Sequence, residues 1–326
     1  MGPTRKSTLP GTTHLTLPIP LTHSLHPHTY LHPLQYNKQV AATIGIAHSL
    51  NLNWAFPATI DALPVGTLFG FQGSLDPQEI ESAYVLKEIR PQFYNVSAQY
   101  HSTFSSSSSS SSSATTTRPD PHAAANTIIS LEGYYQWHQY FDQIQETLRQ
   151  LLQIQPEILE RVETELPEVT YPDTVALHVR RSDYLSYRYI YNVLRIRYYA
   201  AALALLDDEE KIGTVIVLSD DIPWTKQFLV HLPYKIMYSP FEDEPLLDFT
   251  VLARCRRLIM ANSSFSWWAA YLKMMFFGNG TVVAPVPWYT PTGPNARLNS
   301  MDFYFPHWHR VRSWKGGGKN RGSSFW

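Results

Sequence analysis

From residue 173 to residue 285 the chain alternates short apolar runs with segments of helical period, and this alternation constrains the fold most. The apolar runs predict buried strands at residues 175–179, 214–218, 234–238, 258–261 and 281–285. Apolar residues at three- and four-residue spacing predict helices between most of them, at residues 195–206, 223–229, 246–255 and 265–276. This order is typical of an α/β domain whose parallel sheet is doubly wound. Ligands of such domains bind beyond the carboxyl ends of the strands, so the residues that follow each strand are the functional candidates.

The remainder of the chain divides where its composition changes. Residues 1–33 hold six prolines without a helical or alternating period, which predicts an extended or disordered arm. Nine consecutive serines begin at Ser105 and predict a solvated loop over residues 105–117. We therefore expect an N-terminal domain at 34–170, a nucleotide-binding domain at 171–312 and a flexible tail at 313–326.

The expected N-terminal domain contains two strongly patterned segments. Apolar residues at helical spacing from Val40 to Leu50 predict a helix, which a short strand at residues 52–57 follows. Residues 134–152 place Trp137, Phe141 and Leu148 on one side of a helical period. We expect residues 134–152 to form one amphipathic helix.

The charge balance excludes several classes of function. The chain carries 26 Lys and Arg against 27 Asp and Glu, so neither nucleic acid nor an anionic membrane is an expected partner. Its single cysteine, Cys255, excludes an intrachain disulfide and a multi-cysteine zinc site, so no structural metal is implied. No apolar stretch approaches the roughly 20 residues of a membrane-spanning helix, and no signal peptide is recognisable, which predicts a cytoplasmic or otherwise soluble protein.

The first candidate site follows the predicted strand 175–179 and includes His178, Arg180, Arg181 and Asp183. Two adjacent guanidiniums at the end of a strand are costly to hold together without an anion, and guanidinium binds phosphate in bidentate fashion. One interpretation is therefore a phosphorylated ligand. In the other, Arg180 pairs with Asp183 as a structural contact while Arg181 faces solvent.

The second candidate follows the predicted strand 258–261 and opens an apolar helix. Asn262 or Ser263 is suited to cap this helix, and the hydroxyls of Ser264 and Ser266 could join the free amides in binding an anion. Simple helix capping explains the same residues. Asp220 and Asp221, which follow the strand 214–218, form the third candidate: one of them should cap the next helix, and the other could accept hydrogen bonds from a base or ribose.

These loops follow strands of one predicted sheet and should converge at one edge, which indicates a nucleotide site. The chain has neither a Walker loop nor a Gly-x-Gly-x-x-Gly segment after a strand. Phosphate transfer from ATP and dinucleotide binding therefore have no support from motifs.

The order and spacing of residues 178–184, 217–224, 247–255 and 262–272 resemble glycosyltransferase family 11, the α-1,2-fucosyltransferases. The resemblance implies two facing Rossmann-like domains (a GT-B-like fold), of which the N-terminal one at 34–170 should form the acceptor side. The donor would be GDP-fucose and the acceptor a glycan, with inversion and α-1,2 linkage to galactose, and the reaction would need no metal and no other cofactor. The resemblance also implies that the arginine segment holds the pyrophosphate. The expected donor-binding residues are Arg180, Asp220, Asp221, Asn262, Ser263, Ser264, Phe265 and Ser266.

The chemistry of a sugar whose leaving group is a nucleoside diphosphate suggests the catalytic roles. Arg180 should neutralise the leaving diphosphate, while Arg181 and Asp183 orient the segment. His178 and Asp183 are candidates for the base that deprotonates the acceptor, although a buried structural role is equally open for His178.

One departure from the family pattern leaves the activity open. The glycine-rich loop that normally opens family members is replaced here by residues 34–39, Leu-Gln-Tyr-Asn-Lys-Gln. Where backbone must approach a substrate closely, loss of glycine could abolish activity or change substrate choice. A catalytically inactive nucleotide-sugar-binding protein and a fucosyltransferase with a different acceptor are therefore alternative hypotheses.

Overall fold

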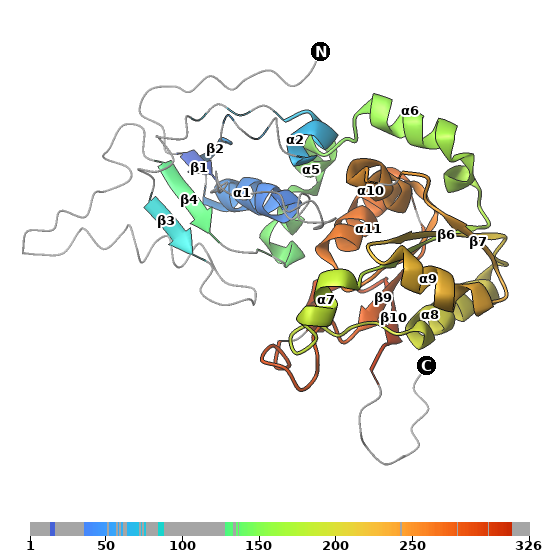
Figure 1. Ribbon diagram of the computed structural model, residues 1–326. Coiled ribbons are helices and arrows are strands. Elements are labelled where there is room, and N and C mark those ends of the chain that lie inside the picture. Colours follow the sequence, from blue (N-terminus) through green and yellow to red (C-terminus); the bar gives the residue numbers. More distant parts are fainter. Residues whose placement is uncertain are drawn as a thin grey trace, which may run out of the picture. The chain divides into compact units, whose positions relative to one another are not determined.

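The computed structural model describes residues 14–16, 36–50, 52–56, 58, 60, 64–71, 73, 75, 84–87, 128–132, 135, 137–241, 243–278, 280–298 and 300–314. The chain forms two compact units (Figure 1). One contains residues 1–161 and 243–250, and the other contains residues 162–242 and 251–326. The sequence placed the boundary at residue 170 and gave residues 243–250 to the second domain. The serine-rich loop at 105–117 lies outside the described residues, as do most of the predicted arm and tail.

The second unit is built on a six-stranded parallel sheet. Its strands are β5 (Thr174–Val179), β6 (Thr214–Ser219), β7 (Lys235–Tyr238), β8 (Arg257–Ile259), β9 (Val282–Val286) and β10 (His309–Arg312). The sheet order is β10-β9-β8-β5-β6-β7. Read from β7 and numbered along the chain within this unit, that order is 3-2-1-4-5-6, the arrangement of a doubly wound nucleotide-binding sheet. The predicted doubly wound fold is confirmed.

The helices of this unit agree closely with the predicted segments. Its main helices are α8 (Ile196–Glu209), α9 (Ile222–Phe228) and α11 (Ser264–Phe276). It also contains the short α7 (Ser182–Ser186) and the carboxyl-terminal ends of α6 (Pro156–Glu165) and α10 (Pro245–Arg254). The sequence did not predict β10. This strand alternates half-buried and exposed residues at the edge of the sheet, and so it lacks the apolar run that marks a buried strand.

The two faces of β5 contact different helices. Val175, Leu177 and Val179 pack in one cluster with α8 residues. The ring of His178, on the opposite face, lies against Phe265 of α11, with the ring centroids 5.4 Å apart. Because successive side chains of a strand point to opposite faces, residues 180 and 181 leave the strand on the α11 side and the α8 side respectively.

The first unit contains a four-stranded parallel sheet in the order β2-β1-β4-β3. Its elements are β1 (His14–Thr16), β2 (Asn53–Trp54), β3 (Tyr84–Lys87), β4 (Ile128–Glu132), α1 (Tyr36–Leu50), α2 (Pro64–Phe69) and α5 (Gln145–Leu151). Strand β1 lies in the segment predicted as an arm and pairs with both β2 and β4. The fully buried Thr16 shows why this short segment is ordered.

The predicted helix over residues 134–152 is wrong in its first half. Residues His138–Tyr140 and Asp142–Ile144 form two 3-10 turns, and the α-helix begins only at Gln145. Gly45 of α1 packs on this segment so closely that a Cβ would lie 2.1 Å from the carbonyl oxygen of Tyr140. Docking against α1 therefore favours tight turns that bury Tyr140 and Phe141 together over a continuous helix.

Of the helices described here, none is long and apolar enough to cross a membrane.

Candidate functional site

The candidate site lies in the second unit, at the carboxyl ends of β5, β6 and β8. Strands β5 and β8 are neighbours in the sheet, with Val175 paired to Arg257 and Leu177 to Ile259. The direction of winding reverses between these two strands. In an open α/β sheet, the crevice at this switch point is where ligands bind.

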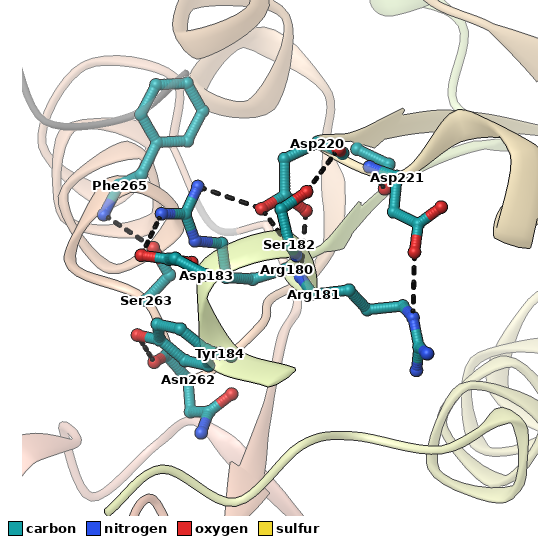
Figure 2. A network of polar contacts seen from close by, with 11 residues as sticks. Arg180, Arg181, Ser182, Asp183, Tyr184, Asp220, Asp221, Asn262, Ser263 and Phe265 are labelled. Carbon is teal, nitrogen blue, oxygen red and sulfur yellow. Dashed lines mark hydrogen bonds and ion pairs between the residues drawn. The ribbon is translucent and has the colours of Figure 1, made fainter. Parts of the chain in front are cut away.

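Arg180 occupies this position with a buried guanidinium, 7% exposed at the side chain. Its Nη2 donates to Oδ2 of Asp183 at 2.7 Å, and its Nη1 lies 3.1 Å from Oδ2 of Asp220. Figure 2 shows the guanidinium directed to the side on which Ser263 and Phe265 open α11. The cation and the amino end of a helix therefore lie on the same side of the switch point.

Asp220 anchors the arginine segment from the neighbouring strand. Its carboxylate accepts the backbone N–H groups of Arg181 at 2.8 Å and of Ser182 at 3.1 Å, besides contacting Arg180. The Ser182 hydroxyl donates to the Asp220 carbonyl at 2.6 Å. Burial raises the pKa of Asp220, and the charge of Arg180 and these N–H groups oppose that rise. Asp220 thus holds both the start of α7 and the guanidinium of Arg180 in place. The sequence did not reveal this role.

Arg181 points away from Arg180 and contacts α9. Its Nε donates to Oδ2 of Asp221 at 3.2 Å, and its guanidinium lies 4.2 Å from the ring centroid of Trp224. Asp221 also caps α9, because its Oδ1 accepts the N–H of Trp224 at 3.1 Å. The predicted capping role is confirmed. The idea that both guanidiniums face one anion is wrong, because adjacent residues leave the strand on opposite faces. Arg181 does not face solvent either, since its side chain is 15% exposed.

Three serines, Ser263, Ser264 and Ser266, lie at the start of α11, and their hydroxyls have different environments. Ser263 is the N-cap, and its Oγ accepts the N–H of Phe265 at 3.3 Å. The Ser266 hydroxyl is fully buried and donates to the carbonyls of Ala261 and Ser263. Ser266 therefore cannot serve the anion site predicted for it, because the helix backbone occupies its hydroxyl. Ser264 is half-buried at the first position of the helix, and no hydrogen bond of its hydroxyl is seen within the described residues.

Asn262 holds loops together and does not face a ligand with its amide. Its Nδ2 donates to the carbonyls of Asn192 at 3.0 Å and Trp288 at 2.7 Å, and the residue is fully buried. The Tyr184 hydroxyl donates to the carbonyl of Asn262 at 2.9 Å. Both hydrogens of the Asn262 amide are therefore used to hold loops together, whereas its Oδ1 is buried without a hydrogen-bond partner among the described residues.

The geometry distinguishes between the two roles considered for His178, catalytic base and buried structural residue. The residue is 2% exposed, and its Nδ1 is buried without a hydrogen-bond partner among the described residues. Burial, followed by the charge of Arg180, lowers the pKa of His178 to about 3. An imidazole this weakly basic is a poor proton acceptor near neutrality, which favours the structural interpretation.

An aromatic column beside the site was not foreseen from the sequence. Tyr184 stacks on Tyr191 with centroids 4.3 Å apart and planes at 10°, and Tyr191 in turn stacks on Tyr289 at 5.9 Å. The guanidinium of Arg180 lies 5.5 Å from the ring centroid of Tyr184. The only sequence signal was the density of tyrosine after the arginines, which does not reveal stacking across almost 100 residues.

This arrangement is suited to binding an anion. A buried guanidinium and the positive end of a 13-residue helix flank the switch point of a parallel sheet. Within the described residues, no group of three or more His, Cys, Asp or Glu side chains is arranged to hold a metal ion. A doubly wound sheet with such a site defines a domain of the kind that binds nucleotides and related phosphorylated ligands.

The family can be stated more narrowly. The model of glycosyl transferase family 11 matches residues 124–312, more than half of the chain, and the chain belongs to this family. The resemblance found in the sequence is thereby confirmed.

Relatives of this chain include two proteins of Escherichia coli and one of Saimiri sciureus. An alpha-1,2-colitosyltransferase of Escherichia coli is 30% identical over 190 residues, which cover 55% of this chain and 61% of that protein. The O-antigen biosynthesis glycosyltransferase WbnK of Escherichia coli is 31% identical over 134 residues, covering 40% and 43%. The galactoside alpha-(1,2)-fucosyltransferase 1 of Saimiri sciureus is 30% identical over 103 residues, covering 30% and 28%. The match spans about half the length of the two bacterial relatives.

Two fucosyltransferases are among the solved structures that resemble the chain. POFUT1 in complex with GDP-fucose has a TM-score of 0.49 at 11% identity, covering 85% of this chain and 97% of that one. NodZ alpha-1,6-fucosyltransferase co-crystallised with GDP has a TM-score of 0.43 at 14% identity, covering 80% and 92%.

Proposed function

We propose that this protein transfers fucose from GDP-fucose to a glycan hydroxyl, with inversion, and forms an α-1,2 linkage to galactose. Membership of glycosyl transferase family 11 supports the reaction type. The linkage is supported by two relatives, an alpha-1,2-colitosyltransferase and a galactoside alpha-(1,2)-fucosyltransferase. The second of these also supports a fucosyl donor and a galactoside acceptor.

The observation that carries the proposal is the position of Arg180 at the switch point, on the same side as the start of α11. Breaking the bond between a sugar and a nucleoside diphosphate leaves negative charge on the diphosphate and develops positive charge on the sugar ring. A fixed guanidinium and a helix N-terminus stabilise that negative charge without reorganising during the reaction. We expect transfer without a metal ion, and therefore full turnover in the presence of EDTA.

Asp183 is the partner of Arg180 that a phosphate can replace. Its side chain is 35% exposed, whereas that of Asp220 is 3% exposed and also receives two backbone N–H groups. Phosphate binding would therefore displace Asp183 and leave Asp220 in place. The displaced carboxylate then becomes the remaining candidate for the base, because His178 is neutral and weakly basic.

The test is a transfer assay with purified protein, GDP-fucose and a galactose-terminated acceptor. The proposal predicts equal release of GDP and of a fucosylated product, with an α-1,2 linkage by NMR. Binding of GDP-fucose without any product would contradict the enzyme and support an inactive nucleotide-sugar-binding protein. That alternative draws on one further observation: α1 begins at Tyr36, so most of the segment that replaces the family's glycine-rich loop is helical.

A further inference from the structure

The chain segment after the arginine site, residues 185–189, exposes an unusual amount of apolar surface. Six large hydrophobic side chains are exposed among the described residues, and three of them lie here: Leu185 at 44%, Tyr187 at 48% and Tyr189 at 58%. We call this segment the tyrosine loop. Single exposed apolar residues are common, but three within five residues indicate a contact surface.

The tyrosine loop is held rigidly at its base. The carbonyl of Tyr187 accepts the N–H groups of Ile190 at 2.8 Å and Tyr191 at 2.9 Å. From the segment after β9, the Thr290 hydroxyl donates to the carbonyl of Arg188 at 2.8 Å. Gly293 approaches so closely that a Cβ there would lie 2.0 Å from the carbonyl oxygen of Tyr189. The exposed rings are therefore presented on a fixed backbone, which lowers the entropy lost on binding.

The tyrosine loop also lies at the edge of the sheet that carries the candidate site. It follows β5, and the residues that brace it follow β9, so both segments leave the carboxyl ends of parallel strands. The stack of Tyr184, Tyr191 and Tyr289 connects the base of the loop to Arg180. A molecule bound on the loop would be adjacent to a sugar whose diphosphate is held by Arg180.

We infer that the tyrosine loop binds the acceptor glycan, with Tyr187 and Tyr189 as specificity-determining residues. This inference rests on the proposed function. A pyranose presents an apolar face of C–H groups and a rim of hydroxyls, which matches a tyrosine ring with its hydroxyl. The acceptor has to meet the donor at this edge of the sheet. All residues that carry the inference lie in the second unit. The inference places part of the acceptor surface in the nucleotide-binding unit, whereas the sequence suggested only the N-terminal half.

The experiment compares the double variant Tyr187→Ala/Tyr189→Ala with Tyr171→Ala. Tyr171 is a matched control because it is 46% exposed in the same unit but precedes β5, at the opposite edge of the sheet. The double variant should raise the KM for a galactoside acceptor about tenfold, as loss of a central aromatic contact commonly does. The affinity for GDP and the slow hydrolysis of GDP-fucose without acceptor should stay within about twofold of wild type. The Tyr171 variant should match wild type in all three measurements.

Three results would overturn the inference: an unchanged acceptor KM in the double variant, an equal rise in the Tyr171 variant, or loss of self-association in the double variant alone. The last would assign the loop to contact between copies of this chain. Failure of the proposed function is a separate outcome, because wild type would then release no GDP. In that case, saturation-transfer NMR with methyl β-galactoside tests whether the tyrosine loop binds the sugar. A signal that wild type and the Tyr171 variant show and the double variant loses supports the inference. Absence of the signal in wild type refutes the inference.

Discussion

The loops after β5 and β8 lie side by side at one edge of the sheet and are built from opposite chemistry. The β5 loop carries two guanidiniums, each tied to a carboxylate of its own loop or of the β6 loop. The β8 loop is neutral, and its polar groups are a serine cap, a buried amide and the first N–H groups of α11. Both loops offer donors to an anion, but only one of them carries charge.

This difference indicates which protein contacts a bound ligand can replace. Buried cations need partners when no ligand is bound, and Asp183 and Asp220 supply them for Arg180. The donors of the β8 loop belong to the helix itself and need only the Ser263 cap. Ligand binding should therefore rearrange ion pairs at β5 and leave the β8 loop unchanged.

The largest effect is expected at Arg180. Arg180→Lys keeps the charge but cannot bridge the Asp220 carboxylate and a phosphate, so kcat should fall by about 10² to 10³. The matched substitution Arg181→Lys, on the other face of the strand, should cost less than about tenfold. Steady-state kinetics with saturating acceptor would measure both. Equal losses in the two variants would show that the guanidiniums act together, against the observed geometry.

The next effect concerns the anchor of the β5 loop. Asp220→Asn removes the buried charge that holds Arg180, and the free energy of unfolding should fall by about 1.5–3 kcal/mol. Asp183→Asn should cost less than about 1 kcal/mol, because its carboxylate is 35% exposed. Urea denaturation of the two variants tests the order. If Asp183→Asn proves the more destabilising, Asp183 is not the exchangeable partner.

His178, beneath both loops, predicts a pH dependence of stability. The pKa of His178 is lowered from its ordinary value of 6.5 to about 3, so the unfolded chain binds a proton between these pH values and the folded chain does not. The contribution is fully present above pH 6.5 and is lost as the pH falls, with a slope approaching about 1.4 kcal/mol per pH unit. His178→Leu should flatten this slope, whereas the exposed His231→Gln should not. Urea denaturation between pH 4 and 7 would measure it, and an unchanged slope in His178→Leu would refute the assignment.

The smallest effects should separate the two hydroxyls of α11. Ser264→Ala should weaken GDP binding by up to about tenfold through loss of a hydrogen bond to a charged oxygen, with little change in stability. Ser266→Ala should lower the free energy of unfolding by about 1 kcal/mol and leave GDP affinity unchanged. Calorimetric titration and urea denaturation test both variants. The reverse pattern would place the anion elsewhere on the helix.

The fold of the second unit was predictable because its strands are short apolar runs between helical segments. Five strands agree with the prediction to within two residues at either end. The sequence did not predict β10, because this edge strand alternates in polarity. In the first unit, the sequence did not predict the turns at residues 138–144, because they depend on Gly45, which lies more than 90 residues away along the chain. Periodicity records which face is buried, but it does not record what that face packs against.

Within the candidate site, the sequence identified the loops that meet at the carboxyl edge of the sheet, but not the contacts that several of their side chains make. Arg180 was predictable, since a guanidinium at a strand end is rare without a charged partner. The anchoring by Asp220 was not, because its contacts with Arg181 and Ser182 join residues 38 and 39 positions apart. The inward turn of Ser266 depends on the backbone carbonyls of its own helix, which residue type alone does not reveal.

The amino-acid sequence by itself determined the alternation of strand and helix, the position of polar residues at strand ends and the membership of a glycosyltransferase family. These properties are local, or they are carried by residue order and spacing. Only the tertiary structure decided that Arg180 and Arg181 diverge, that Asp220 holds the first of them, and that three tyrosines stack beside it. Such pairings depend on which strands become neighbours, and strands separated along the chain become neighbours only once the sheet has formed.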